Sequence, residues 1–201
     1  MRGLRDIQRE SPGEYNLALF TAAVVVLIGV EEGILLAMVL SLLRIVRHSY
    51  RPHTGVFVVS EDNAWRLVPA VPGAVTEPGL VIYRFGAALF YANASLFAEE
   101  IRGLVGPAPS PTRWLVVDAE AITNVDYTAA RMVRQLQKEL VHCGIVLALA
   151  RVSLSLKADL DRHLLTEVVG PVRVFDRLHD ALAAFAELKD PSQSLSGETS
   201  L

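Results

Sequence analysis

A long apolar segment near the N-terminus constrains this chain more than any other feature of its sequence. Residues 17–30 are apolar apart from Thr21, Glu31 and Glu32 follow, and a second, mostly apolar run occupies residues 33–43. Hydrophobic residues make up 52% of the 201-residue chain, and their excess is concentrated here. A segment of this kind is expected to lie in a membrane, so the chain divides into two parts that fold in different solvents.

Two arrangements of this segment fit its length. As helices the two runs would be roughly 21 and 16 Å long, each shorter than the ~30 Å hydrocarbon core, whereas together they reach roughly 40 Å. A single tilted span would place Glu31 and Glu32 near the midplane, at a cost of ~2.5–3.5 kcal/mol for each carboxylate. A helical hairpin over residues 17–46, preceded by a cytoplasmic or interfacial lead over residues 1–16, would place both glutamates at its turn.

The charges that flank the segment favour the hairpin. Arginines lie on both sides of it: Arg2, Arg5, Arg9, Arg44, Arg47 and Arg51. Positive charge on both sides favours two cytoplasmic ends, which a hairpin satisfies. Such short helices need other membrane helices to pack against, because their broken backbone must be satisfied inside protein. A secretory signal peptide is a weaker alternative, since no small-residue cleavage site follows the first run.

The rest of the chain is mildly acidic, with 13 basic and 17 acidic residues in positions 52–201. This balance gives no support to nucleic-acid binding, which depends on clustered positive charge. Cys143 is the only cysteine, so the chain cannot form an internal disulfide and fits a reducing compartment.

Beyond Pro52 the strand and helix patterns alternate. We expect strands over residues 55–60, 65–68, 80–85 with a short extension at 88–91, 114–117, 145–150 and 172–175, and helices over 93–105, 128–143, 155–165 and 176–188. Asn93 is expected to cap the first helix, and Gly144 to end the second. The alternation predicts an α/β domain over residues 55–188, a partly parallel sheet flanked by about four helices. Residues 189–201 are polar and serine-rich, as in a disordered tail.

Three stretches carry a resemblance to a known family. They are residues 33–43 followed by Arg51-Pro52-His53, residues 81–85 with 89–93, and residues 114–122 with 125–129. The first is similar to the last membrane helices of the SulP (sulfate permease) family and to their exit into the linker. The second resembles the first long strand and helix start of a STAS domain. The third is similar to the strand and loop that carry the signature of STAS domains and anti-sigma-factor antagonists.

The resemblance covers roughly residues 1–188 in order. It implies a STAS-type sheet in the cytoplasm that follows the last membrane helices of an anion transporter in the inner membrane. Such a domain regulates or assembles the transporter and needs no cofactor and no catalytic residue, so we expect no enzyme. The implied partners are membrane lipid, the remaining transporter helices, a second copy through the transporter, and a regulatory protein.

The helices that form the anion pathway are not in this sequence, so we expect a transporter fragment that cannot transport alone. Two alternatives stay open. The chain could be a degenerate, non-functional remnant. The chain could instead be a membrane-tethered signalling module that resembles anti-sigma-factor antagonists and is switched at Thr128.

The loop of Asp126, Tyr127, Thr128 and Ala129 is the first candidate site. In the related antagonists the matching loop reads Asp-Ser-Ser/Thr-Gly, and its second hydroxyl is phosphorylated to control partner binding. Here Tyr127 replaces the first small residue and Ala129 replaces the glycine. From the residues themselves we favour a structural interpretation over phosphorylation, in which Thr128 caps the following helix and Asp126 complements its dipole.

The helix after this loop carries the second candidate, a basic stripe of Arg131, Arg134 and Lys138 at i, i+3 and i+7. A solvated face is the ordinary interpretation of such a stripe. The sharper alternative is a docking surface for an acidic partner or for the transporter's own cytoplasmic loops. Asp118 and Glu120 at a strand end have no His, Cys or Lys beside them in the sequence, and the histidines have no ligand spacing, so we expect neither hydrolytic chemistry nor a metal.

Overall fold

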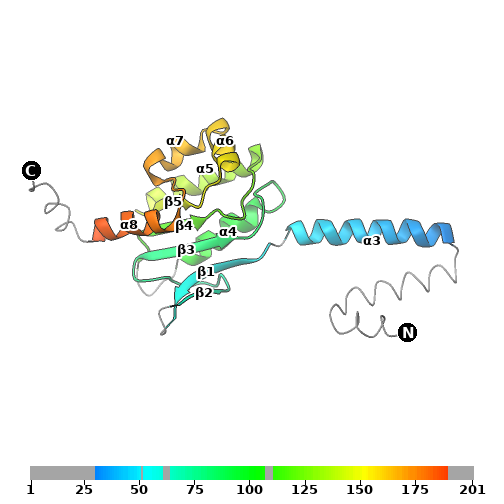
Figure 1. Ribbon diagram of the computed structural model, residues 1–201, viewed down its shortest axis with the longest axis horizontal. Helices are drawn as coiled ribbons and strands as arrows, with labels where there is room; N and C mark the ends of the chain where they lie inside the picture. The colour runs from blue at the N-terminus through cyan, green and yellow to red at the C-terminus, as the bar shows by residue number, and fades with distance from the viewer. Residues whose placement is uncertain (1–29, 51, 61–63, 107–110, 190–201) are drawn as a thin grey trace, which may run out of the picture. The chain divides into compact units, whose positions relative to one another are not determined.

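The computed structural model describes residues 30–50, 52–60, 64–106 and 111–189. The chain divides between Tyr50 and Arg51 into two compact units. The first unit contains one described helix, α3 (Val30–Tyr50), with Glu31 and Glu32 in its first turn (Figure 1). Carboxylates are favourable there because the amino end of a helix carries partial positive charge.

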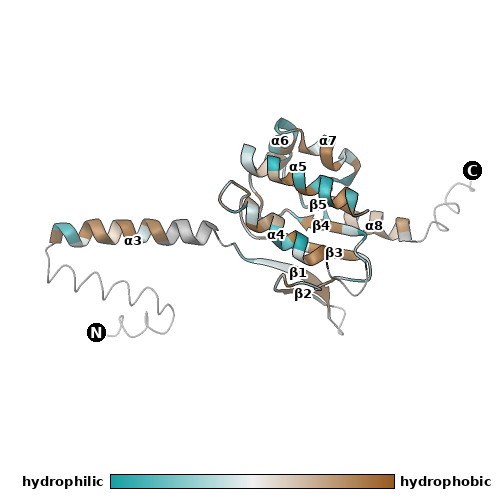
Figure 2. Ribbon diagram, turned by 180° about the vertical axis from the view of Figure 1, so that it is seen from behind, coloured by the Kyte–Doolittle hydropathy of each residue, from teal (hydrophilic) through white to brown (hydrophobic). Residues whose placement is uncertain are grey.

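Helix α3 confirms that the second apolar run is helical, although the helix continues as far as Tyr50. Hydrophobic residues cover most of its described length, as Figure 2 shows. Within the described part of the chain, no helix combines the length and the hydropathy that a membrane crossing requires. The lead, the first apolar run and the polar tail from residue 190 lie outside the described residues, so the hairpin and the tail stay predictions.

The second unit is built on a five-stranded sheet in the order β2-β1-β3-β4-β5 (Figure 1). Its strands are β1 (Thr54–Val59), β2 (Trp65–Val68), β3 (Leu80–Phe85), β4 (Trp114–Asp118) and β5 (Val146–Ala150). Strand β1 is antiparallel to both β2 and β3, while β3, β4 and β5 are parallel. The predicted α/β class is confirmed, and the carboxyl ends of the three parallel strands meet at one edge.

Helices cover both faces of this sheet. They are α4 (Ala94–Val105), α5 (Tyr127–His142), α6 (Leu154–Arg162), α7 (Leu165–Val169) and α8 (Leu178–Lys189), with a 3₁₀ helix, η1 (Pro171–Arg173), before the last. Helices α4 to α7 pack on one face, against a core that includes Tyr83 and Val117. Helix α8 packs on the other face, where Phe185 meets Trp114. Burial on both faces explains why the central strands are continuously apolar.

The predicted end of α5 is confirmed. Gly144 has φ +71°, the left-handed conformation that glycine adopts without a steric penalty. Its N–H donates to the carbonyl of Val141 at 3.0 Å, and the N–H of Ile145 donates to the carbonyl of Leu140 at 2.8 Å. These two bonds form a Schellman motif, which ends the helix and directs the chain into β5.

Two of the predicted strand segments are wrong. Residues 88–91 do not extend β3, because Leu89 forms only an isolated parallel bridge with Val125. Residues 172–175 are not a sheet strand either, since Pro171 begins a 3₁₀ helix and Val174 forms only an isolated bridge with Leu149. Proline lacks the N–H that a ladder needs and has a backbone φ that suits the first turn of a helix.

Two predictions about helices are also wrong. The helix expected over residues 155–165 ends at Arg162, Leu164 has φ 56°, and the five-residue α7 follows. Asn93 precedes α4 but makes no side-chain capping bond to it. Its buried amide instead donates to the carbonyl of Ala88 at 2.9 Å and accepts from the N–H of Phe90 at 3.0 Å, which fixes the preceding loop.

Candidate functional site

Asp126 organises the loop at the start of α5. Its Oδ1 accepts a hydrogen bond from the N–H of Ala129 at 2.8 Å, and its Oδ2 accepts one from the N–H of Tyr91 at 2.9 Å. Asp126 is therefore the N-cap of α5, and the prediction that Thr128 caps this helix is wrong. Thr128 lies in the first turn with its side chain exposed.

The loop is fixed from both sides by neighbouring segments. The N–H of Leu89 donates to the carbonyl of Asn124 at 3.1 Å, and the N–H of Asp126 donates to the carbonyl of Leu89 at 3.2 Å. On the other side, the N–H of Val125 donates to the carboxylate of Asp159 in α6 at 3.3 Å. These bonds fix the position of the exposed first turn of α5. A surface that is fixed in this way could bind a partner without the cost of reorganisation.

The two departures from the antagonist loop have different consequences. Ala129 is fully buried, so its methyl group faces the core and does not obstruct an approaching partner. Tyr127 is 62% exposed, and its ring lies edge-on to the ring of His163, with 6.5 Å between the centroids. Tyr127 is therefore the residue that would change how a partner contacts this loop.

The basic stripe lies along the outer side of α5. Arg131 and Lys138 are exposed, while Arg134 is partly buried. A groove of about 520 Å³ runs between these side chains, and its remaining lining residues are Thr128, Met132 and Gln135. The structure thus brings Thr128 and all three cations of the stripe to one surface.

A network of four charges at the carboxyl edge of the sheet was not predicted from the sequence. The fully buried Asp118 accepts from Arg151 Nε at 2.7 Å, and Arg84 lies 3.7 Å from it. Glu120 accepts from Arg84 Nη2 at 2.7 Å and lies 3.0 Å from Arg151 Nη1. Both guanidinium groups also lie over the ring of Phe57, at 6.0 and 5.9 Å from its centroid.

This network is electrically balanced, with two cations and two carboxylates, so it offers no net charge to a ligand. We interpret it as a structural link between β1 and the ends of the parallel strands. The sequence did hold a signal for it. Arg84 lies near the end of β3 and Arg151 directly follows β5, and the ends of parallel strands share an edge with Asp118.

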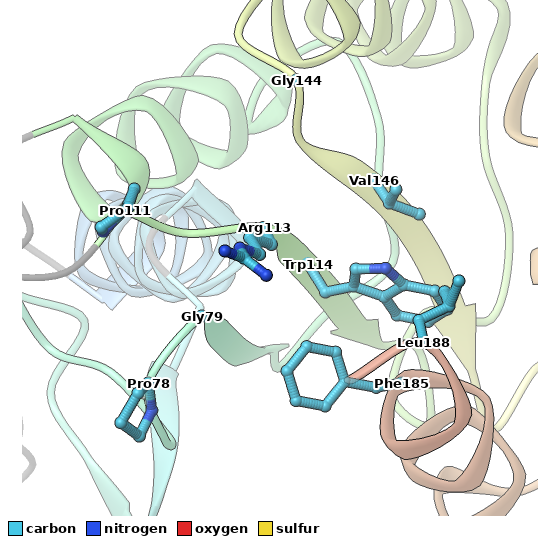
Figure 3. Close-up of a pocket in the computed structure, with 9 residues that line it drawn as sticks. All are labelled: Pro78, Gly79, Pro111, Arg113, Trp114, Gly144, Val146, Phe185 and Leu188. Atoms are coloured by element: carbon cyan, nitrogen blue, oxygen red, sulfur yellow. The ribbon is translucent and has the colours of Figure 1, made fainter. Parts of the chain in front are cut away.

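An apolar cavity of about 630 Å³ opens at the opposite edge, near the amino ends of the parallel strands (Figure 3). Arg113 is the only charged side chain among its described lining residues, and it lies between the prolines Pro78 and Pro111 and the indole of Trp114. The Trp114 and Phe185 rings, 5.9 Å apart, form one wall. No acid–base pair lines this cavity, and no group of three potential ligands for a metal occurs among the described residues.

Comparisons with known proteins agree with this geometry. The family profile of the STAS domain matches residues 72–181. The chain belongs to the STAS domain family. This match begins before β3 and ends within α8, so it includes the loop of Asp126 and the basic stripe.

Relatives of this STAS domain include sulfate transporters from bacteria and plants. A probable sulfate transporter of Mycobacterium tuberculosis is 36% identical over 182 residues, which cover 90% of this chain and 32% of that protein. The chloroplastic sulfate transporter 4.1 of Arabidopsis thaliana is 24% identical over 179 residues, or 84% of this chain and 26% of that protein. The chain spans about a third or less of these relatives' length. The predicted relationship to SulP transporters is confirmed.

Solved structures confirm the fold of the STAS domain. The murine Solute Carrier 26 family member A9 anion transporter in the inward-facing state aligns with 92% of this chain and 30% of its own, with TM-score 0.74 and 18% identity. A sulfate transporter family protein from Wolinella succinogenes aligns over 66% of this chain and 97% of its own, with TM-score 0.51 and 21% identity.

Proposed function

We propose that this STAS domain is the cytoplasmic regulatory and assembly domain of a SulP-type transporter of sulfate or another anion in the cell membrane. The observation that carries the proposal is the extent of the similarity to the mycobacterial probable sulfate transporter. That similarity covers 182 residues, more than the second unit, residues 51–201, can hold. It therefore includes part of the apolar segment, and we assign residues 17–46 to the membrane part of the transporter.

The surface of α3 supports a membrane role. Seven of its described apolar side chains are at least half exposed: Val30, Ile34, Leu35, Met38, Val39, Leu42 and Leu43. Burial of a fully exposed apolar side chain contributes about 1.5–3 kcal/mol, so side chains that are half to two-thirds exposed would each contribute roughly 1–2 kcal/mol. An exposed apolar surface of this extent fits lipid or neighbouring membrane helices as its partners.

A regulatory role also agrees with the chemistry of the domain. Among the described residues, the charges at the sheet edge neutralise one another and the cavity beside Trp114 is apolar, so neither place combines a nucleophile with a base. The relatives named above are transporters. We assign partner binding to the first turn of α5 and its basic stripe. The proposed partners are the remaining transporter helices, a second copy through the transporter, and a regulatory protein.

Fractionation of cells that express the full chain tests the proposal. We expect the chain in the membrane fraction, where it co-purifies with a polytopic transporter in mild detergent. Lysines at Leu35, Met38 and Leu42, on one face of α3, should release it. As a control, lysines at Leu154 and Val172, which are 89% and 81% exposed on the STAS domain, should not release it. Recovery of the unaltered chain as a soluble monomer without detergent would refute the proposal.

A second candidate function rests on Thr128. Thr128 is an exposed residue in the first turn of α5, where a kinase could reach it. In this alternative the chain is a membrane-tethered signalling module, similar to anti-sigma-factor antagonists, whose partner binding is switched by phosphorylation of Thr128. Thr128→Glu should then change the affinity for the partner without changing the fold. An unchanged affinity would argue against the switch.

A further inference from the structure

The arginines of the STAS domain differ in whether they have an internal partner. Four of them lie within ion-pair distance of a carboxylate in the same domain: Arg84, Arg102, Arg151 and Arg162. Among the described residues no such pair is found for Arg131, Arg134 or Lys138, although positions 52–201 hold more acidic than basic residues. What distinguishes α5 is that three such cations lie close together on one helix, and this clustering does not follow from composition.

The groove between these cations has the form of a binding surface. Arg131 and Lys138 are seven residues apart, which corresponds to about 10 Å along the helix axis. Arg134 lies between them, and its Nε atom is buried without a hydrogen-bond partner. A buried donor that lacks an acceptor is unfavourable, and a rotation of the Arg134 side chain that brings this atom to an acceptor in the groove would remove the penalty.

The nearby carboxylate on the same helix does not neutralise the stripe. Glu139 accepts from Arg102 of α4 at 2.7 Å and from Gln135 at 3.1 Å. These bonds hold the carboxylate toward α4. The groove therefore keeps its positive charge.

We propose that the groove on α5 binds a carboxylate-rich polypeptide segment of a partner protein, with one carboxylate each at Arg131, Arg134 and Lys138. This inference rests on the proposed role of the domain in partner binding and adds the chemistry of that partner. Guanidinium groups bind carboxylates with two parallel hydrogen bonds, which gives geometric selection as well as attraction. The partly buried Met132 supplies an adaptable apolar contact for the aliphatic part of the segment.

Binding of labelled acidic peptides to the full chain in a neutral maltoside detergent tests this proposal. The probes are a fluorescein-labelled decaglutamate and a decaglutamine, measured by fluorescence anisotropy. We expect binding of the glutamate peptide alone. Its Kd should rise at least tenfold when sodium chloride is raised from about 0.05 to about 0.5 M, because salt shortens the Debye length and screens the attraction between the three cations of the stripe and the peptide carboxylates.

Two triple variants with the same change in net charge separate the groove from overall electrostatics. Arg131→Gln with Arg134→Gln and Lys138→Gln should raise the Kd at least tenfold. The control, Lys157→Gln with Arg162→Gln and Arg177→Gln, alters exposed positions outside the groove and should change the Kd less than twofold. Circular dichroism checks that both variants are folded.

Three outcomes would overturn the inference. They are no binding of decaglutamate, an equal loss of affinity in both triple variants, and stripe-dependent binding of monomeric dihexanoyl phosphatidylserine in place of the peptide. The last would assign the groove to a lipid headgroup. None of these outcomes affects the membrane fractionation described above, so failure of this inference is distinguishable from failure of the proposed function.

Discussion

The buried carboxylate of Asp118 is held by Arg151 through two hydrogen bonds, from Nε to Oδ1 at 2.7 Å and from Nη2 to Oδ2. Arg151 follows β5 with φ 57°, a left-handed conformation that is unfavourable for a residue with a side chain. The pair joins the ends of β4 and β5. We infer that its bidentate geometry stabilises the backbone conformation of Arg151.

Removal of the carboxylate in Asp118→Ala should therefore destabilise the domain. Breaking a buried ion pair from one side costs about 3–5 kcal/mol, and because the Arg151 side chain is 30% exposed we expect the lower end, about 3 kcal/mol. Chemical denaturation of the full chain in detergent, followed by tryptophan fluorescence, measures the loss. Arg162→Ala, which removes an exposed pair, should cost less than about 1 kcal/mol. Equal losses would show that the buried pair has no special role.

The burial of Tyr83 predicts that the domain loses stability at alkaline pH. Burial, together with the hydrogen bond that its hydroxyl donates to Glu100 at 2.6 Å, raises the pKa of Tyr83 far above its ordinary value. In the unfolded chain a tyrosine ionises near pH ~10. The contribution of the neutral Tyr83 side chain to the free energy of unfolding is therefore fully present below that pH. Above it the contribution is lost, by about 1.4 kcal/mol per pH unit.

Absorbance of phenolate at 295 nm, compared between the wild type and Tyr83→Phe, checks this prediction. The absorbance that the substitution removes should appear in the wild type only as the domain unfolds at high pH. Tyr83→Phe should also cost about 1.5–3 kcal/mol at neutral pH, because it removes a hydrogen bond to a charged group. Ionisation of Tyr83 in the folded domain near pH ~10 would contradict the assignment.

The sequence predicts the central sheet well because local and global signals agree there. The apolar run at residues 114–117 predicts a strand covered on both faces, and β4 is fully buried. The network around Asp118 could not be predicted in the same way. Its contact with Arg151 depends on the parallel register that places Asp118 opposite Ala150, and that register is set by the whole sheet.

The errors arise where tertiary contacts decide local structure. Nothing near Leu164 in the sequence announces a left-handed residue, so the break between α6 and α7 has no local signal. Asn93 lies where an N-cap is expected, but its side-chain amide forms hydrogen bonds with the backbone of Ala88 and Phe90 in the preceding loop. The resemblance to a family signature located the loop of Asp126, but it did not identify Asp126 as the N-cap of α5.

Gly144 offers a test of backbone conformation alone. A Cβ atom at this position would meet no atom within 4 Å, so Gly144→Ala should destabilise only through the left-handed φ of +71°. That conformation costs a non-glycine residue about 1–2 kcal/mol. Gly103→Ala, inside α4 and with only Pro72 nearby, is the matched control and should stabilise the domain by about 0.5–1 kcal/mol. Loss of stability in both variants would point to packing instead.

The last prediction separates the cap of α5 from its candidate switch. Asp126→Ala removes the acceptor for two backbone N–H groups, those of Ala129 and Tyr91, so it should cost about 1–2 kcal/mol. Thr128→Ala should cost less than about 0.5 kcal/mol, because Thr128 is an exposed residue of the first turn and does not cap the helix. Denaturation of the two variants side by side measures both values. If Thr128→Ala were the more destabilising change, the threonine would have a structural role that the geometry of the loop does not give it, and effects of Thr128→Glu on partner binding could then arise from unfolding of this turn instead of from added charge.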